Sequence, residues 1–306
     1  MMKKTFIFLF LLGLVFSGSY LLGSGKFNLQ KGPTSQIEKE HFFSSRFTSI
    51  PLPIQNHFFT IVILGKNNGV SVEKTLDSVF SQNYENFRIL YIDDASEDES
   101  FDLASDLIYE SKQSLRVTST KNETPLGDLA NLVRAVESCG DEEIVVVLGS
   151  GEWLAHEWVL QRMNSYYADP DLWMAYGNAC TYPEFEIGEC PIANWEEGDC
   201  RKSMKIAPSL KSFYAGLFKK IHKEDFIARG QYLTASSDFA YTVPLLEMAA
   251  EHFHWIPEVL YIRSSDNFPE NPEAEAHCEQ FIRRLPSYPK ICGSLFSPKA
   301  IEDGAL

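Results

Sequence analysis

The chain has 306 residues, enough for one large domain or two small ones, and its 44% hydrophobic and 13% aromatic content can supply a packed core. Asp and Glu number 42 against 27 Lys and Arg, which gives a net charge of -15. No run of basic residues could follow a phosphate backbone. The composition therefore excludes a disordered chain and argues against a nucleic-acid partner.

The first residues combine a basic start with an apolar run. Lys3 and Lys4 precede the apolar residues 6–16, and small residues at 17–19 offer a cleavage position. We expect residues 1–23 to be a signal peptide or an uncleaved signal anchor with its N-terminus inside. Either interpretation predicts an extracytoplasmic protein that is secreted, periplasmic, lumenal or anchored by a single membrane pass. Residues 24–56, rich in Ser, Gln, Pro and Gly, are expected to form a stem.

Six cysteines permit disulfides in an exported chain but do not require them. Cys180, Cys190 and Cys200 follow one another with nine-residue gaps. This spacing matches no zinc site, so one local disulfide or free buried thiols are expected in place of a metal.

Apolar runs and helical patterns alternate in the first half of the domain. Strands are expected at residues 58–64, 87–92, 115–120 and 143–148, and helices at residues 71–82, from residue 96 and at 127–138. Ser96 and Glu99 have the spacing of a capping box at the start of the second helix. The alternation predicts an α/β fold with a mostly parallel sheet and helices on both faces.

The pattern is looser in the second half. A helix is expected at residues 155–167, followed by a long polar loop at 182–209, helices at 210–221 and 238–253, and a strand at 255–263. A loop of this length is often a lid or a binding loop. Residues 271–306 are expected to form a C-terminal helical tail.

The strand at 143–148 ends in an unusual turn, Gly149-Ser150-Gly151. Ligands of α/β proteins bind at the carboxyl ends of parallel strands, so functional side chains are expected there. Two of these three residues have none.

The segment from residue 58 to residue 100 resembles the opening of the family 2 glycosyltransferases, which have the GT-A fold. That family has a strand, an asparagine turn, a helix ending in Gln-x-Tyr, and a strand closing with Asp-Asp-x-Ser. The corresponding residues here are Asn67, Gln82, Tyr84, Asp93, Asp94 and Ser96. The likeness continues to about residue 263. It implies a single GT-A domain at residues 57–270 that moves a sugar from an activated donor, a nucleotide sugar or a lipid-phosphate sugar, to a hydroxyl acceptor.

The resemblance also assigns roles to single residues. Asp94 is expected to hydrogen-bond the nucleotide base, with capping of the next helix as the alternative, and Asp93 is expected to be structural. Gly65 and Lys66 stand where the family lines the base pocket, and Lys66 either pairs with a phosphate or stays solvated. Asp238 takes the position of the base in inverting enzymes, and the alternative is a carboxylate that only binds helix N–H groups.

At Gly149, Gly151 and Glu152 the family carries Asp-x-Asp-Asp, whose carboxylates hold Mn²⁺ or Mg²⁺ against the donor diphosphate. The two glycines remove most of that site, and Glu152 alone is a weak ligand for a hard cation. We therefore expect no metal ligands and no firm cofactor, although the family uses a divalent metal. Two functions remain open: an inverting glycosyltransferase with Asp238 as base, or an inactive GT-A protein that binds a glycan, a nucleotide or a partner protein.

Overall fold

The computed structural model describes residues 56–149, 151–187, 200–203, 210–235, 237–264 and 272–296. The predicted signal or anchor segment, residues 1–23, lies outside the described residues, as does most of the predicted stem. Among the helices of the described part, none is both long and apolar enough to cross a membrane.

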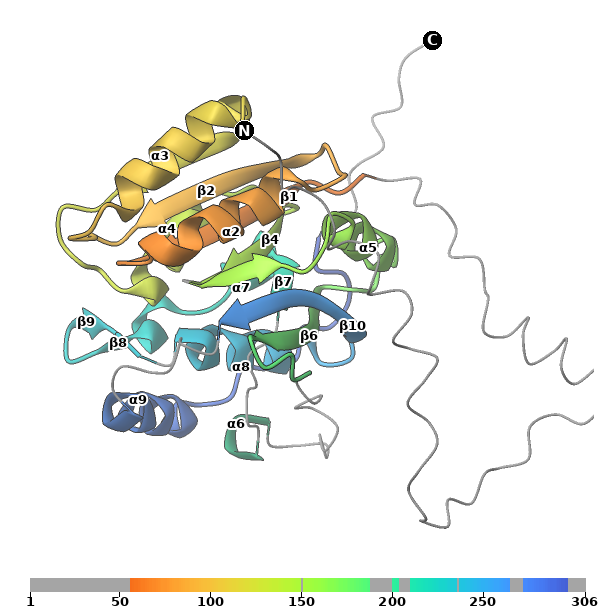
Figure 1. Ribbon diagram of the computed structural model, residues 1–306. Coiled ribbons are helices and arrows are strands. Elements are labelled where there is room, and N and C mark those ends of the chain that lie inside the picture. Colours follow the sequence, from red (N-terminus) through yellow and green to blue (C-terminus); the bar gives the residue numbers. More distant parts are fainter. Residues whose placement is uncertain are drawn as a thin grey trace, which may run out of the picture. The chain divides into compact units, whose positions relative to one another are not determined.

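An eight-stranded sheet lies at the centre of the domain, in the order β3-β2-β1-β4-β7-β6-β10-β5 (Figure 1). Its strands are β1 (Phe59–Gly65), β2 (Phe87–Asp93), β3 (Val117–Lys121), β4 (Ile144–Leu148), β5 (Glu152–Leu154), β6 (Met174–Tyr182), β7 (Leu210–Tyr214) and β10 (Phe253–Ser264). Strands β7 and β5 run antiparallel to their neighbours, and the other six share one direction. The predicted α/β fold with a mostly parallel sheet is confirmed. A separate hairpin joins β8 (Ile227–Ala228) to β9 (Gln231–Tyr232).

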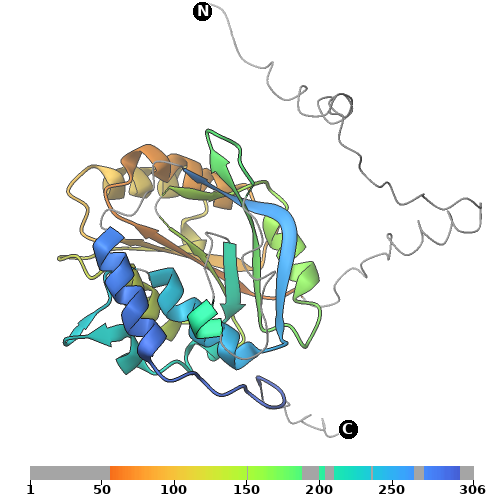
Figure 2. The same cartoon turned by 90° about the horizontal axis from the view of Figure 1, so that it is seen from below.

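Helices cover both faces of the sheet (Figure 2). The chain passes from β1 to β3 through α2 (Gly69–Phe80) and α3 (Ser100–Glu110), which pack side by side. It then returns past β1 to β4 through α4 (Asp128–Glu137), so right-handed crossovers place α4 on the opposite face. The short helix α7 (Ala215–Phe218) and α8 (Ser237–Ala249) pack against α4. The remaining helical elements are α5 (Val159–Tyr166), α6 (Cys200–Ser203), α9 (Pro272–Arg284) and the 3₁₀ turns η2 (Ser114–Arg116) and η3 (Lys223–Phe226).

The burial of the central strands explains why their sequences are apolar without alternation. Every residue of β1 is buried, and four of the five residues of β4 are. Strands with helices on both faces lack a solvent side, so both sets of side chains enter the core. The edge strand β3, in contrast, is largely exposed.

Two sequence predictions were wrong. Residues 210–221 were expected to be helical, but Leu210–Tyr214 is strand β7 and only Ala215–Phe218 is an α-helix. The capping box is not formed either, because α3 begins at Ser100 and the Ser96 hydroxyl accepts a hydrogen bond from the Asn67 N–H at 2.9 Å. Strands β5 and β6 were not predicted at all.

The cysteines of the described part are not paired where their side chains can be followed. Cys139 and Cys180 are buried free thiols, and Cys278 and Cys292 are also free. The local disulfide that was one alternative for Cys180 is therefore not formed, whereas Cys190 lies outside the described residues.

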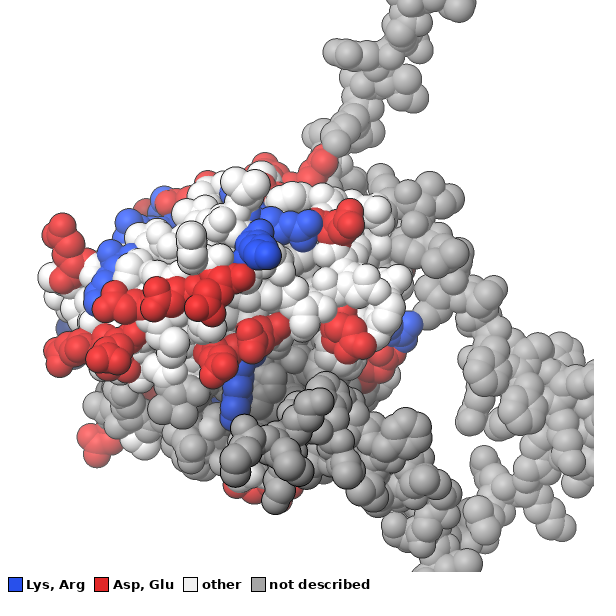
Figure 3. All heavy atoms as spheres, turned by 45° about the horizontal axis from the view of Figure 1, so that its top comes forward, with Lys and Arg blue, Asp and Glu red and all other residues white. Residues whose placement is uncertain are grey.

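Acidic side chains take up more of the face shown in Figure 3 than basic ones, in agreement with the net charge of -15. On helix α3, Asp102, Asp106 and Glu110 are all exposed. Such a surface repels a polyanion.

Arg201 connects α6 to α8 and α9 through buried contacts. Its guanidinium donates to both carboxylate oxygens of Glu247, at 2.9 and 2.7 Å, and to the Ile282 carbonyl at 2.7 Å. The side chains of Arg201 and Glu247 are only 2% and 8% exposed. Removal of one member of such a pair leaves a poorly compensated buried charge.

We predict that Arg201→Met lowers the free energy of unfolding by about 3 kcal/mol, measured by urea denaturation. The Glu247 carboxylate would then keep the Tyr288 N–H, at 3.0 Å, but lose its cation. The double variant Arg201→Met/Glu247→Met should recover most of the loss. Equal stability of Arg201→Met and the wild type would contradict this account.

Candidate active site

Charged residues from several elements meet at one edge of the sheet. The parallel strands β1, β2 and β4 end there, and the antiparallel strands β7 and β5 begin there, which brings Lys211 and Glu152 to the same edge. Strand β10 adds Arg263, which pairs with Glu152 in register. The direction of strand order reverses between β1 and β4, and such a switch point is where open α/β sheets bind ligands.

Asp238 lies in the first turn of α8 and is held by two side chains. Its Oδ2 accepts a hydrogen bond from Lys211 Nζ at 2.7 Å, and its Oδ1 accepts one from the Tyr241 hydroxyl at 2.8 Å. The Asp238 side chain is 52% exposed, whereas that of Lys211 is 5% exposed. The carboxylate is therefore accessible from solvent, and its cationic partner is buried.

This arrangement keeps Asp238 ionised. Desolvation by the surrounding protein raises the pKa of Asp238, but the Lys211 ammonium, the Tyr241 hydroxyl and the Arg263 guanidinium outweigh it, so that the pKa lies below its ordinary value. A proton acceptor has to be ionised before it can act.

The turn after β4 is closed by the side chain of Glu152. Its Oε2 accepts a hydrogen bond from the Gly149 N–H at 2.7 Å, and its own N–H donates to the Gly149 carbonyl at 3.2 Å. A Cβ atom on Gly149 would lie 3.2 Å from Glu152 Oε2, and Gly151 has a φ of +73°, a region that side chains disfavour. Both positions in the turn therefore favour glycine. Helix α2 fixes the turn, because the Thr75 hydroxyl donates to the Glu152 carbonyl at 2.8 Å.

Two carboxyls at this edge of the sheet have raised pKa values. Burial, and next the Asp238 carboxylate, raise the pKa of Glu152 to about 7, against the opposing effects of Gly149 N–H, Lys211 and Arg263. Asp128 is the first residue of α4. Desolvation by neighbouring protein, and then the Asp238 and Asp94 carboxylates, raise its pKa to about 6. The carboxylates of the site therefore repel one another.

Asp94 holds the loop that precedes α4. Its carboxylate is buried and accepts four hydrogen bonds at 2.8 to 2.9 Å, three on Oδ1 from Asn122, Leu126 and Asn131 and one on Oδ2 from Gly127. Desolvation raises the pKa of Asp94, but these bonds together lower it. The contact with a nucleotide base stays a prediction. Oδ2 is the better placed of the two oxygens for it, because Oδ2 accepts one hydrogen bond and Oδ1 accepts three. Asp93 is fully buried and accepts from the Ser96 N–H at 2.8 Å, a structural contact.

The other predicted residues lie at the same edge. Lys66 is exposed and near enough to Asp128 to lower its pKa. Gly65 is close to the Asn68 side chain, whose Oδ1 would lie 3.0 Å from an added Cβ. The motif residue Gln82 is structural, because it donates to the His156 carbonyl at 2.8 Å and so ties α2 to the segment after β5.

These residues do not fit a divalent cation. Among the described residues no group of three or more His, Cys, Asp or Glu side chains could hold a metal ion. Gly149 and Gly151 offer no side-chain oxygen, and the Glu152 carboxylate is engaged within its own turn. A hard cation requires several oxygens, so the site supplies too few.

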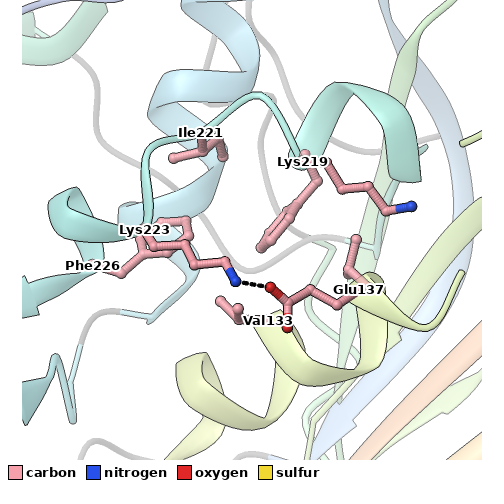
Figure 4. A pocket seen from close by; sticks show the side chains of 8 residues that line it. Val133, Glu137, Lys219, Ile221, Lys223 and Phe226 are labelled. Carbon is pink, nitrogen blue, oxygen red and sulfur yellow. Dashed lines mark ion pairs between the residues drawn. The ribbon is translucent and has the colours of Figure 1, made fainter.

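A pocket of about 390 Å³ lies away from this edge (Figure 4). It is lined by Val133, Val136, Glu137, Phe218, Lys219, Ile221, Lys223 and Phe226. It adjoins the C-terminal half of α4, whereas Asp128 begins that helix. The charged residues of the edge do not line it, so the site is defined by their convergence.

Sequence analysis missed Lys211, Tyr241, Tyr261, Arg263 and Asp128. Burial, and next the Glu152 and Asp238 carboxyls, raise the pKa of Tyr261 well above its ordinary value. Lys211 had one available signal: it lies two residues before Phe213, so in a strand both side chains point to the same face. That spacing was hidden by the helix prediction for the segment.

We predict that Glu152→Gln removes part of the pH dependence of stability. Since the folded-state pKa of Glu152, about 7, exceeds the ordinary value of 4.5, folding takes up a proton between these values, and the stability it gives is lost as pH rises to about 7. The wild type should lose about 2 to 3 kcal/mol relative to Glu152→Gln between about pH 5 and pH 8. Chemical denaturation of both proteins across this range measures the difference, and parallel curves would disprove the raised pKa.

Comparisons with known proteins agree with the fold. The family described as Glycosyl transferase family 2 matches residues 60–224. No curated protein sequence matches the chain. The similar solved structures include S. aureus TarS 1-349 in complex with UDP, with 14% identity, a TM-score of 0.56, and coverage of 74% of this chain and 64% of that one.

A mannosyltransferase from Pyrobaculum calidifontis in complex with GDP-Man and Mn²⁺ has 17% identity and a TM-score of 0.50, with 76% of this chain and 65% of that chain covered. The chain thus spans slightly less than two thirds of the length of both structures. At these identities the likeness shows the fold, and the predicted GT-A arrangement is confirmed. Because the family matches more than half of the 306 residues, the chain belongs to glycosyl transferase family 2.

Proposed function

We propose that the protein transfers a sugar from a nucleotide-sugar donor to a hydroxyl acceptor with inversion, and that Asp238 is the base. The observation that carries this proposal is the accessible Asp238 carboxylate, kept ionised by the buried Lys211 at the ligand-binding edge. The similar structures support the donor class, because TarS is described with UDP and UDP-GlcNAc and the mannosyltransferase with GDP-Man.

In the proposed reaction the acceptor oxygen attacks the anomeric carbon as the bond from that carbon to the diphosphate oxygen breaks. The hydroxyl proton passes to Asp238, and the leaving electron pair goes to the nucleoside diphosphate. Asp94, Gly65 and Lys66 lie on the side of the site proposed for the donor nucleotide. The low pKa makes Asp238 a weak base that needs no deprotonation at neutral pH.

The turn Gly149–Glu152 is proposed to replace the acidic motif that binds metal in this family. Its two glycines, and the hydrogen bond that Glu152 Oε2 accepts from the Gly149 N–H, support transfer without a divalent cation. The N-terminal sequence supports an extracytoplasmic location, where the donor would have to be supplied across a membrane.

The second candidate is an inactive GT-A protein that binds a glycan, a nucleotide or a partner protein. The same glycine turn favours it, because it lacks the charge that stabilises a leaving diphosphate. So does Asp94, whose carboxylate already has four internal donors. Turnover separates the two candidates.

We predict that Asp238→Asn abolishes sugar transfer while nucleotide binding is retained. The amide cannot take the acceptor proton, so an interaction made mainly in the transition state is lost. The measurement is release of UDP or GDP from UDP-GlcNAc, GDP-Man and other nucleotide sugars, with titrations of UDP binding alongside.

Asp141→Asn is the matched control, because Asp141 also pairs with a lysine, Lys219, at 2.8 Å, but precedes β4 at the opposite edge of the sheet. It should keep wild-type turnover. Turnover that survives in Asp238→Asn would refute the base, and no turnover by the wild type on any donor would favour the binding protein.

We predict that Gly149→Asp/Gly151→Asp does not restore a manganese site. Aspartate at Gly151 meets the positive φ, which costs about 1 to 2 kcal/mol of stability. Aspartate at Gly149 places its side chain against the Glu152 carboxylate. Manganese titration and urea denaturation check both statements, and manganese binding at wild-type stability would show that the turn accepts the acidic motif.

A further inference from the structure

Lys211 is a buried cation on the central strand β7, beside the carboxyl ends of the parallel strands. It pairs with Val147 of β4 in register, two residues before the glycine turn. Its side chain is 5% exposed, and it faces the accessible Asp238. We propose that Lys211, with Arg263 beside it, forms a metal-independent site for the diphosphate group of a nucleotide.

The position of Lys211 supports this assignment, because its charge acts on both sides of the site. Lys211 Nζ is 2.7 Å from Asp238 Oδ2 on α8, and its charge also lowers the pKa of Glu152 at the start of β5. Arg263 acts on the same two carboxyls. A cation between the base and the glycine turn lies where the family places the charge that its metal supplies. This last step rests on the proposed function.

The charge balance of the site points the same way. The cations here are Lys66, Lys211 and Arg263, and Lys211 and Arg263 both act on Asp238 and Glu152. The raised pKa values of Glu152 and Asp128 let these carboxyls take up a proton when an anion approaches, which lessens the negative charge that a diphosphate meets. A diphosphate is attracted to positive charge in a partly desolvated site. Lys211 is the buried member of this group, so its charge is the least screened by water.

The alternative is that Lys211 only balances Asp238. Removal of Lys211 would then weaken nucleotide binding indirectly, because the uncompensated Asp238 carboxylate repels phosphate. The two explanations differ once Asp238 is neutral. A direct contact is lost in either background, whereas an indirect effect disappears together with the Asp238 charge.

The test is calorimetric titration of the full chain with UDP and with GDP, in EDTA, for the wild type, Lys211→Met, Asp238→Asn and the double variant. Lys211→Met should weaken binding by about ten-fold or more, about 1.4 kcal/mol, in both backgrounds. Lys211→Arg should stay close to the wild type, and Asp238→Asn should bind at least as tightly. Lys219→Met is the matched control, since Lys219 pairs with Asp141 away from the site, and it should leave binding unchanged.

A loss confined to the background that contains Asp238 would overturn the proposal. Absence of UDP and GDP binding by the wild type would overturn it too, as would tightening by manganese of about ten-fold with no effect of Lys211→Met. If Lys211→Met does not fold, the comparison of the double variant with Asp238→Asn decides, because neither has a carboxylate at position 238. Nucleotide binding through Lys211 without turnover would refute the proposed transfer but keep this site.

Discussion

The insertion of β7 into the sheet is the constraint on which the rest of the domain depends. This short strand pairs antiparallel with β4 on one side and β6 on the other, so it joins the four parallel strands of the first half to β6, β10 and β5. Its reversed direction also brings its first residues to the edge where its neighbours end. The parallel strands reach this edge with their last residues, so their side chains near the site come from the loops that follow. Lys211 is the second residue of the antiparallel strand β7, and it therefore reaches the site from within the sheet.

Local pattern predicted the half of the sheet whose strands are apolar on both faces. Strands β1, β2 and β4 are mostly apolar runs, and each is followed or preceded by a helix with clear periodicity. Strand β7 carries Lys211 and Ser212 among apolar residues, a mixture that also fits the first turn of an amphipathic helix. Its pairing with β4 and β6 decides between the two, and residues distant in sequence provide that information. The same holds for β5, which is only three residues long.

The candidate site was predictable only where a motif carried it. Asp94, Glu152 and Asp238 follow from the resemblance, and the structure brings them to the same edge of the sheet. Their partners depend on tertiary contacts: Tyr241 is one helical turn from Asp238, but Lys211 lies 27 positions away in the sequence, and Tyr261 meets Glu152 through the pairing of β10 with β5. Such contacts determine which carboxyl is ionised. Asp238 and Glu152 are both desolvated carboxyls, yet the direct ion pair lowers the pKa of one while the other is raised to about 7.

The glycine turn and the buried lysine are related by electrostatics. Carboxylates at the turn would add negative charge next to Glu152, Asp238 and Asp128. Desolvation, and next the Asp238 carboxylate, already raise the pKa values of Glu152 and Asp128. A divalent cation can offset such a cluster only with enough oxygen ligands to hold it. An ammonium attached to a central strand needs no ligand set, because the fold holds it in place, and it carries one charge where a metal carries two. Glycine at positions 149 and 151 adds no carboxylate to this group, so Lys211 and Arg263 act only on the carboxyls already present, Asp238 and Glu152 among them.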